Sequence, residues 1–245
     1  MNNQQTIKNI EIQIKQLEKN TSTNKRLKLI EELCSSGKKG EQSLLNYLID
    51  RRIINEKKIL LIDGLIFEKL YKTKNQDIIT KLKQYFSKGI IKLNNNLTLN
   101  YQPLQDLLIN QNFQEADKLT QEYLCTLAGL NTNIESTRKW LYFTDIDMIP
   151  SEDLLHIDLL WQIYSRGKFG FSIQRKIWMK NSCKWKIFWH NIGWIKNDIP
   201  CRYPKEFIWT IDAPQGHLPL FNQLRGKQVL CAIFNHIVWQ QTYKL

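Results

Sequence analysis

Few side chains in this sequence are arranged for catalysis. The four histidines (His156, His190, His217 and His236) lack the spacing of metal ligands, and the five cysteines form no Cys-x-x-Cys pair. Buried free thiols are therefore expected rather than disulfides or a zinc site. No Ser-His-Asp or Cys-His arrangement, phosphate-binding glycine loop, His-Glu-x-x-His motif or paired-carboxylate signature is present. The sequence predicts a binding protein and not an enzyme.

Aromatic side chains beside glycines are the strongest remaining signal. All eight tryptophans lie from Trp140 onward. Gly170 stands between Phe169 and Phe171, where it allows either a flat molecule to approach the backbone or the chain to bend sharply; local evidence favours the bend, a corner of the core. A few basic residues stand near these aromatics, namely Arg166, Lys168, Arg175 and Arg225. Such a set suits a large, flat, apolar ligand with anionic edges, and it also suits single-stranded nucleic acid.

A helix is predicted to position the first of these rings. Leu154, Trp161 and Tyr164 recur at helical spacing, which indicates an amphipathic helix with aromatic rings on one face. Ser151 can cap its first turn, and the Ser-Arg-Gly sequence at 165–167 is typical of a helix end.

Residues 213–219 are predicted to form a shaped loop, because two prolines and a glycine restrict its backbone. The loop has too few apolar residues for a core of its own, so we expect it to be mobile without ligand and to close over one. For His217 we expect a hydrogen bond within its own turn rather than a role as a metal ligand.

The chain is predicted to be all-α, with two domains. Helical periodicity runs from residue 7 to about 89, so residues 1–93 are expected to form a basic N-terminal helical bundle, a stack of helix pairs. The asparagines at 94–96 are the expected linker. Residues 98–245 are expected to form an all-helical domain with long functional loops. Its helices are predicted at 104–110 and 113–129, followed by an irregular aromatic-rich region after Trp178 and a final helix over 226–239.

Charge is unevenly divided between the two parts. Residues 1–100 hold 19 Lys and Arg against 10 Asp and Glu, whereas residues 101–245 hold 16 against 13. Most of the positive charge therefore lies away from the aromatics. Because it is spread over several helices and interleaved with acids, it is expected to be a solvated face and not a nucleic-acid stripe.

No apolar run approaches the roughly 18 residues that span a bilayer. The N-terminus lacks the apolar segment of a signal peptide and has too many acids for a typical transit peptide. Asn, Lys and Ile are used heavily, as in AT-rich plastid genomes. The expected location is the plastid (chloroplast) stroma for a plastid-encoded protein, or otherwise the cyanobacterial cytoplasm.

Four blocks of sequence resemble, in the right order, the genomes-uncoupled tetrapyrrole-binding family, regulators of magnesium chelatase. They are Tyr101, Leu104 to Leu108 and Glu115-Ala116-Asp117; the run from Asp153 to Gln174; Ile192-Gly193-Trp194; and the loop at 213–219. The resemblance covers about residues 98 to 220, and four ordered blocks are more specific than one motif. Two departures are Phe113, where the family pattern has tryptophan, and the segment after Pro219, which follows no pattern that can be aligned.

The resemblance implies an all-helical domain whose concave apolar surface holds protoporphyrin IX and Mg-protoporphyrin IX as ligands, with no protein-bound metal. It implies a non-catalytic activator of magnesium chelatase that contacts the large porphyrin-binding subunit of that enzyme. Peripheral membrane association is a further option, and no nucleic-acid partner is expected. The basic N-terminal part resembles the extension of cyanobacterial and algal members.

Carried over by position, the resemblance also implies a set of porphyrin-binding residues. Phe169, Phe171 and Ile173 would lie on or beside the apolar floor; Trp189, Trp194, Phe207 and Trp209 would form its walls; His217, Leu218 and Pro219 would belong to the covering loop; and Arg225 would pair with a propionate. Two alternatives stay open: a single-stranded nucleic-acid binder that uses the basic helices and exposed aromatics, and a helical scaffold that docks a partner through its basic half.

Overall fold

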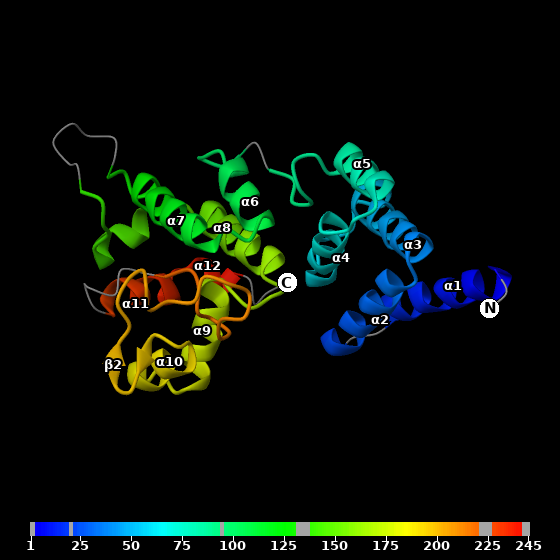
Figure 1. The fold of residues 1–245 in the computed structure, drawn as a ribbon. Helices are drawn as coiled ribbons and strands as arrows, with labels where there is room; N and C mark the ends of the chain where they lie inside the picture. The colour runs from blue at the N-terminus through cyan, green and yellow to red at the C-terminus, as the bar shows by residue number, and fades with distance from the viewer. Residues whose placement is uncertain (1–2, 20–21, 94–95, 131–137, 221–226, 242–245) are drawn as a thin grey trace. The chain divides into compact units, whose positions relative to one another are not determined.

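The computed structural model describes residues 3–19, 22–93, 96–130, 138–220 and 227–241 of the chain. The chain divides into two compact units, Met1–Lys92 and Leu93–Leu245, which are described separately below. Both units are helical, and the only β-structure among the described residues is a hairpin of two short strands (Figure 1). The prediction of an all-α fold is confirmed.

Helices pack around α3 in the N-terminal unit. The elements are α1 (Asn3–Lys19), α2 (Thr23–Ser35), α3 (Lys38–Ile49), the π-helix η1 (Asp50–Ile54), α4 (Leu61–Tyr71) and α5 (Gln76–Tyr85). Each of the other five elements contacts α3. Leu44, Leu45 and Leu48 of α3 are fully buried, because residues three and four apart share one face of a helix.

The turn between α2 and α3 follows from two glycines. Gly37 takes a φ of +70°, a conformation that glycine adopts readily, and α2 ends just before it. Gly40 allows the two helices to touch, since a Cβ atom at this position would lie 1.8 Å from the carbonyl oxygen of Leu33. The short helices of this unit are thus set close together by the sequence at their ends.

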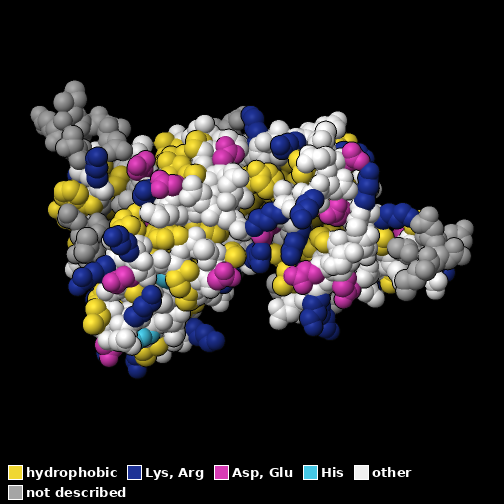
Figure 2. All heavy atoms as spheres, viewed as in Figure 1, with side chains coloured by type: hydrophobic (Ala, Val, Ile, Leu, Met, Phe, Trp, Pro, Cys, Tyr) yellow, Lys and Arg dark blue, Asp and Glu magenta, His cyan; other side chains and the backbone are white. Residues whose placement is uncertain are grey.

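The basic residues of this unit are interleaved with acids. Over helices α1 to α5, lysine and arginine side chains alternate with acidic ones on the visible face (Figure 2). Lys72 pairs with Glu68 at 2.9 Å, and Lys92 pairs with Glu56 at 2.6 Å. Of these four side chains, Glu68 is largely buried and the other three are exposed to solvent. The arrangement is that of a solvated face with exposed ion pairs, each of which adds little stability.

Among the described residues of the N-terminal unit, one ion pair is buried. Asp63 is fully buried on α4, and its Oδ1 accepts a hydrogen bond from Nε of Arg51 at 2.8 Å. Its Oδ2 accepts from Nη2 of Arg51 at 3.2 Å and from the backbone amide of Leu60 at 2.9 Å. Asp63 therefore fixes both the start of α4 and the position of η1 against it.

The C-terminal unit contains shorter helices joined by longer loops. Its elements are α6 (Gln102–Ile109), α7 (Phe113–Leu127), the 3-10 helix η2 (Phe143–Met148), α8 (Ser151–Tyr164), α9 (Phe171–Lys180), α10 (Trp185–Asn191), β1 (Ile195–Lys196), β2 (Ile199–Pro200), α11 (Gln228–Asn235) and α12 (Val238–Gln241). The strands are antiparallel, with Ile195 opposite Pro200.

Helix α8 lies at the centre of this unit and is the helix expected from the sequence. Trp161 is fully buried, and its Nε1–H donates to the hydroxyl of Thr120 on α7 at 3.0 Å. The hydroxyl of Tyr164 donates to the side-chain oxygen of Gln105 on α6 at 2.8 Å. The aromatic face of α8 therefore holds α6 and α7, because each ring combines a large apolar area with one polar atom that needs a partner.

Three local predictions were wrong in detail. Ser151 is the first residue of α8 and makes no capping bond, since Pro150 takes the capping position. The region after Trp178 contains the helix α10, which clustered aromatics hid from the helical pattern. The expected final helix is divided into α11 and α12, because His236 adopts a ψ of 138° that ends α11. The linker predicted at 94–96 lies largely outside the described residues.

Among the described residues, no helix is long and apolar enough to span a bilayer.

Candidate functional site

The joint between α8 and α9 is built on a buried carboxylate. Oδ1 of Asp158 accepts the backbone amide of Ser172 at 3.0 Å, and Oδ2 accepts the side-chain amide of Gln162 at 2.7 Å. Gly170, between the two helices, has a φ of +128°. A Cβ atom there would lie 2.6 Å from Oδ1 of Asp158. The sharp bend expected at this glycine is thus what the structure contains, and Phe169 and Phe171 beside it are fully buried.

The loop at 213–219 is packed into the unit rather than laid over it. The amide of Gly170 donates to the carbonyl of Leu218 at 3.0 Å. The side-chain amide of Gln174 donates to the carbonyls of Gly216 and Pro219 at 2.9 and 2.8 Å. Leu218 is fully buried. The loop has no core of its own, as expected, and takes its core from α9 elsewhere in the chain; its mobility without ligand stays a prediction.

The residues expected to contact a ligand are mostly packed inside the unit, and two of the aromatic ones contact the loop at His217. Phe169 packs edge-to-face on Phe113 at a centroid distance of 5.3 Å. Trp194 is buried and donates its Nε1–H to the carbonyl of His217 at 2.8 Å, while Phe207 lies 5.6 Å from the His217 ring. Ile173 and Pro219 are also buried, and Trp189 and Trp209 are half-buried. Arg225 lies outside the described residues.

His217 joins three segments of the chain. Nδ1 lies 2.6 Å from the carbonyl oxygen of Ile192, and Nε2 lies 3.0 Å from the backbone nitrogen of Ile208. Since a carbonyl accepts and an amide donates, Nδ1 carries the proton and Nε2 accepts. Burial lowers the pKa of this imidazole, which keeps it neutral. The partners lie in other segments and not in its own turn, and both nitrogens are used, so the ring is a structural link.

Replacing His217 with alanine is expected to destabilise the C-terminal unit by about 2–3 kcal/mol near pH 7.5, because two buried backbone groups lose their partner. Since the folded pKa is below the unfolded value, the unfolded chain takes up a proton first, and wild-type stability falls as pH drops through about 6.5. The difference between the two proteins should therefore shrink at pH 5.5. Urea unfolding monitored by tryptophan fluorescence measures the free energy of unfolding of both proteins. A difference of the same size at both pH values would contradict the assignment of a neutral, hydrogen-bonded imidazole.

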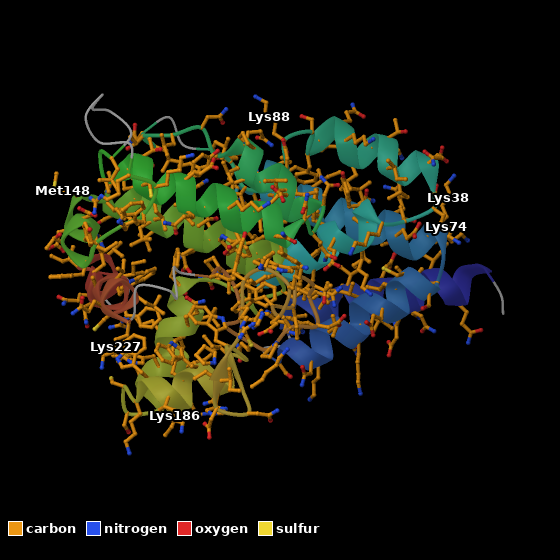
Figure 3. The ribbon with its side chains drawn as sticks, turned by 60° about the vertical axis from the view of Figure 1, so that its left-hand side comes forward. Lys38, Lys74, Lys88, Met148, Lys186 and Lys227 are labelled. Carbon is orange, nitrogen blue, oxygen red and sulfur yellow. The ribbon has the colours of Figure 1, made fainter. Side chains whose placement is uncertain are left out.

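Aromatic rings that a ligand could reach lie elsewhere, on η2 and just before it. Tyr142 and Phe143 are 50% and 51% exposed, and Met148 is 68% exposed; Met148 stands at the edge of the unit (Figure 3). The guanidinium of Arg138 lies 4.3 Å from the centroid of the Tyr142 ring and forms a 2.9 Å ion pair with Asp145. This η2 surface combines flat apolar area with an ion pair whose two side chains are largely buried.

Helix α7 and a second exposed ring, Tyr203, belong to the same unit as η2. Burial raises the pKa of Cys125 near the end of α7, and the charges of Arg138 and Asp145 act on it with opposite sign. Tyr203 is half exposed, and its pKa is raised by burial and, to a smaller extent, by the charge of Asp117 near the start of α7. The amide of Leu220 donates to Oδ1 of Asp117 at 2.6 Å, and burial raises the pKa of Asp117 to about 8. We call the region from Tyr203 along α7 to the η2 surface the α7 surface.

Comparison with known proteins accounts for both units. Residues 94–237 match the model of the GUN4-like family. Residues 1–87 match the ARM-like repeat domain of the GUN4 N-terminal type. The chain belongs to the GUN4-like family.

Relatives of this GUN4-like chain include an uncharacterised Ycf53 protein of Pyropia yezoensis, 44% identical over 94% of this chain and 98% of the relative. The chloroplastic tetrapyrrole-binding protein of Arabidopsis thaliana is 37% identical over 54% of this chain and 52% of the relative. The solved structure of GUN4 from Chlamydomonas reinhardtii is 38% identical, with a TM-score of 0.55, over 61% of this chain and 95% of that one.

Sequence reasoning missed the exposed rings of this GUN4-like unit. Tyr142 and Phe143 stand close to Trp140 in a short aromatic run, and that run is the signal that could have found them. No glycine or proline marks the run as a loop, so it does not share the pattern of the predicted site residues. Most of those residues are aromatic, lie in turns or on α9 and α10, and are packed inside the unit, where large rings fill the core.

Proposed function

We propose that this GUN4-like chain binds a tetrapyrrole, with protoporphyrin IX and Mg-protoporphyrin IX as its ligands. The observation that carries the proposal is the match of residues 94–237 to the family, together with a relative, 37% identical, that is named a tetrapyrrole-binding protein. A flat macrocycle with an apolar face and anionic propionates matches a surface of exposed rings and a basic side chain.

The α7 surface is the proposed binding face. Tyr142 and Phe143 would lie against the macrocycle, and Lys118, which pairs with Glu115 in solvent, would turn to a propionate. The part of α7 that follows Lys118 is about 15 Å long, a length that admits a flat ring system. The buried residues predicted from the sequence, among them Phe169, Trp194, His217 and Leu218, would support this face from beneath rather than touch an incoming ligand first.

Affinity should fall in the micromolar range. Covering both faces of a porphyrin removes about 300 Å² of apolar surface from water, worth ~7 kcal/mol. The loss of translational freedom and the ordering of the protein on binding cost several kcal/mol. Such a balance suits a protein that takes up a tetrapyrrole and passes it on.

The bound form is proposed to act as a non-catalytic activator of magnesium chelatase, through contact with the large porphyrin-binding subunit of that enzyme. Peripheral membrane association is also proposed, and it would place the chain close to its tetrapyrrole ligand. A plastid or cyanobacterial origin is supported by relatives from a cyanobacterium and by one that is chloroplastic; the plastid stroma or the cyanobacterial cytoplasm is the proposed location.

Titration with deuteroporphyrin, followed by quenching of tryptophan fluorescence, tests the proposal. Replacing Phe143 with serine should weaken binding about tenfold, since loss of half a ring of buried area is worth about 1.4 kcal/mol. Ile237→Ser is the matched control, because Ile237 is 60% exposed in the same unit but lies outside the α7 surface. Binding should change little between 50 and 200 mM salt, unlike nucleic-acid binding.

Two results would count against the proposal. If the wild-type chain binds no tetrapyrrole with a Kd below about 100 μM, a binding free energy of ~−5.5 kcal/mol, the proposed function is wrong. A Phe143→Ser chain that binds as tightly as the wild type would keep the function but remove the α7 surface as its site.

A further inference from the structure

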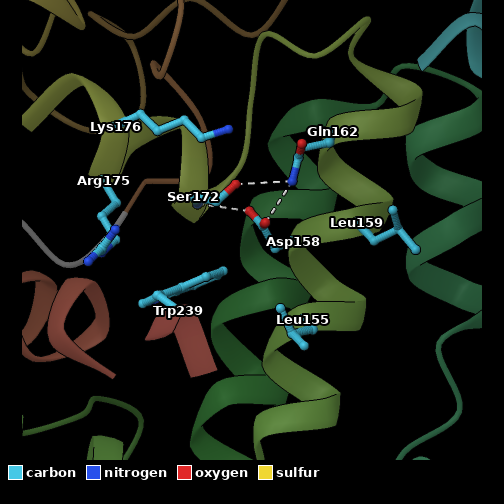
Figure 4. A pocket seen from close by; sticks show the side chains of 8 residues that line it. All are labelled: Leu155, Asp158, Leu159, Gln162, Ser172, Arg175, Lys176 and Trp239. Carbon is cyan, nitrogen blue, oxygen red and sulfur yellow. Dashed lines mark hydrogen bonds between the residues drawn. The ribbon is translucent and has the colours of Figure 1, made fainter. Parts of the chain in front are cut away.

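A pocket of about 370 Å³ opens between α8, α9 and α12. Its walls are formed by Leu155, Asp158, Leu159 and Gln162 of α8, by Ser172, Arg175 and Lys176 of α9, and by Trp239 of α12 (Figure 4). None of these residues belongs to α7 or η2, so the pocket is separate from the α7 surface. Its volume is at the lower end of the ~300–1,000 Å³ typical of small-molecule sites.

The apolar lining of the pocket comes from α8 and α12. Leu155 and Leu159 are one helical turn apart on α8, and both are half-buried. The indole of Trp239 lies between α8 and the guanidinium of Arg175 (Figure 4). The Nε1–H of Trp239 donates to the carbonyl of Ile233 at 2.6 Å, so the ring is fixed and offers carbon surface only.

Most polar groups around this apolar lining already have partners. Both oxygens of Asp158 accept hydrogen bonds, from Ser172 and Gln162. The same Gln162 amide lies 3.0 Å from the hydroxyl of Ser172. Arg175 is held by its Nε–H, which donates to the carbonyl of Phe234 at 2.7 Å. The carboxylate is thus satisfied within the protein and does not call for a cation from a ligand.

Lys176 is different. It is exposed on α9, its side chain runs along the mouth of the pocket towards Gln162 (Figure 4), and among the described residues it forms no hydrogen bond or ion pair, although Asp158 is within electrostatic reach. Arg175 is its neighbour in sequence, but the guanidinium of Arg175 points to the opposite side, beyond Trp239, so Lys176 supplies the positive charge near Gln162 (Figure 4). A group that binds there gains from a negative charge next to an apolar body.

We propose that this pocket binds a small amphipathic carboxylate, with its apolar body against Leu155 and Trp239 and its carboxylate on Lys176. The pocket is a second ligand site of the C-terminal unit. It works independently of the α7 surface, so the protein can hold a tetrapyrrole and a small carboxylate together.

Decanoate is a suitable probe, because it carries one carboxylate on an apolar chain, and 1-decanol is its uncharged match. Calorimetric titration of the full chain should show decanoate binding that is weakened about tenfold by Lys176→Glu, since attraction becomes repulsion at the same place. Lys180→Glu is the control: Lys180 is exposed one turn further along α9 and does not line the pocket. It should leave the affinity within about twofold of wild type, and 1-decanol should bind more weakly than decanoate.

Deuteroporphyrin separates this site from the proposed tetrapyrrole site. Saturating decanoate should leave deuteroporphyrin affinity unchanged, and Phe143→Ser should leave decanoate affinity unchanged. The inference is overturned if Lys176→Glu and Lys180→Glu bind decanoate alike, if 1-decanol binds as well as decanoate, or if decanoate displaces deuteroporphyrin. Because Lys176 is exposed, the variant should fold; an unfolding midpoint equal to that of the wild type confirms this before the titration is interpreted.

Discussion

Replacing Asp63 with alanine is expected to destabilise the N-terminal unit by about 3–5 kcal/mol, the usual cost of leaving one partner of a buried ion pair without the other. Asp63 is fully buried, and its hydrogen bond helps to keep the pKa of Arg51 above its usual value. Without the carboxylate, the guanidinium of Arg51 stays buried and charged. The amide of Leu60 also loses its acceptor at the start of α4.

Far-ultraviolet circular dichroism during urea unfolding measures this loss. Tryptophan fluorescence follows the other unit, because every tryptophan of the chain lies from Trp140 onward, and its transition should stay in place. Asp77→Ala is the control: Asp77 pairs with Lys38 in solvent, and such pairs contribute less than about 1 kcal/mol. If Asp63→Ala and Asp77→Ala cost the same, the buried pair does not organise this unit.

Replacing Gly170 with alanine is expected to destabilise the C-terminal unit by about 3 kcal/mol or more, because two effects add. A φ of +128° is rarely adopted by residues with a side chain, and the new methyl group would lie 2.6 Å from Oδ1 of Asp158. That oxygen already accepts the amide of Ser172, so it cannot move away without leaving the first turn of α9 unpaired.

Tryptophan fluorescence during urea unfolding is the measurement for Gly170→Ala. Gly37→Ala, followed by circular dichroism, is the control, since Gly37 also has positive φ but a methyl group added there would have no atom within 4 Å. It should lose only about 1 kcal/mol, the backbone part of the effect. A Gly170→Ala loss as small as that of Gly37→Ala would mean that Asp158 is not held as the structure has it.

Local features of the sequence were enough to predict the helical fold and the position of α8. Leu154, Trp161 and Tyr164 repeat at the helical period, and that period depends only on the backbone geometry of one helix. The end of α8 was equally accessible, because Gly167 takes the positive φ that its residue type favours. The family blocks could also be recognised, since each is a short run of neighbouring residues.

The tertiary structure alone decided which aromatic rings are exposed. Phe169 and Phe143 are the same residue type, yet the first is fully buried and the second is half exposed. Burial depends on segments that are distant in the chain: Gln174 holds Pro219 across 45 residues, and Asp117 holds Leu220 across 103. The loop at 213–219 has few apolar residues of its own, but α9 provides its core. The pocket at Lys176 likewise forms only where three helices come together. Helical periodicity in the sequence indicates which face of a helix is apolar, but it does not indicate which segment covers that face.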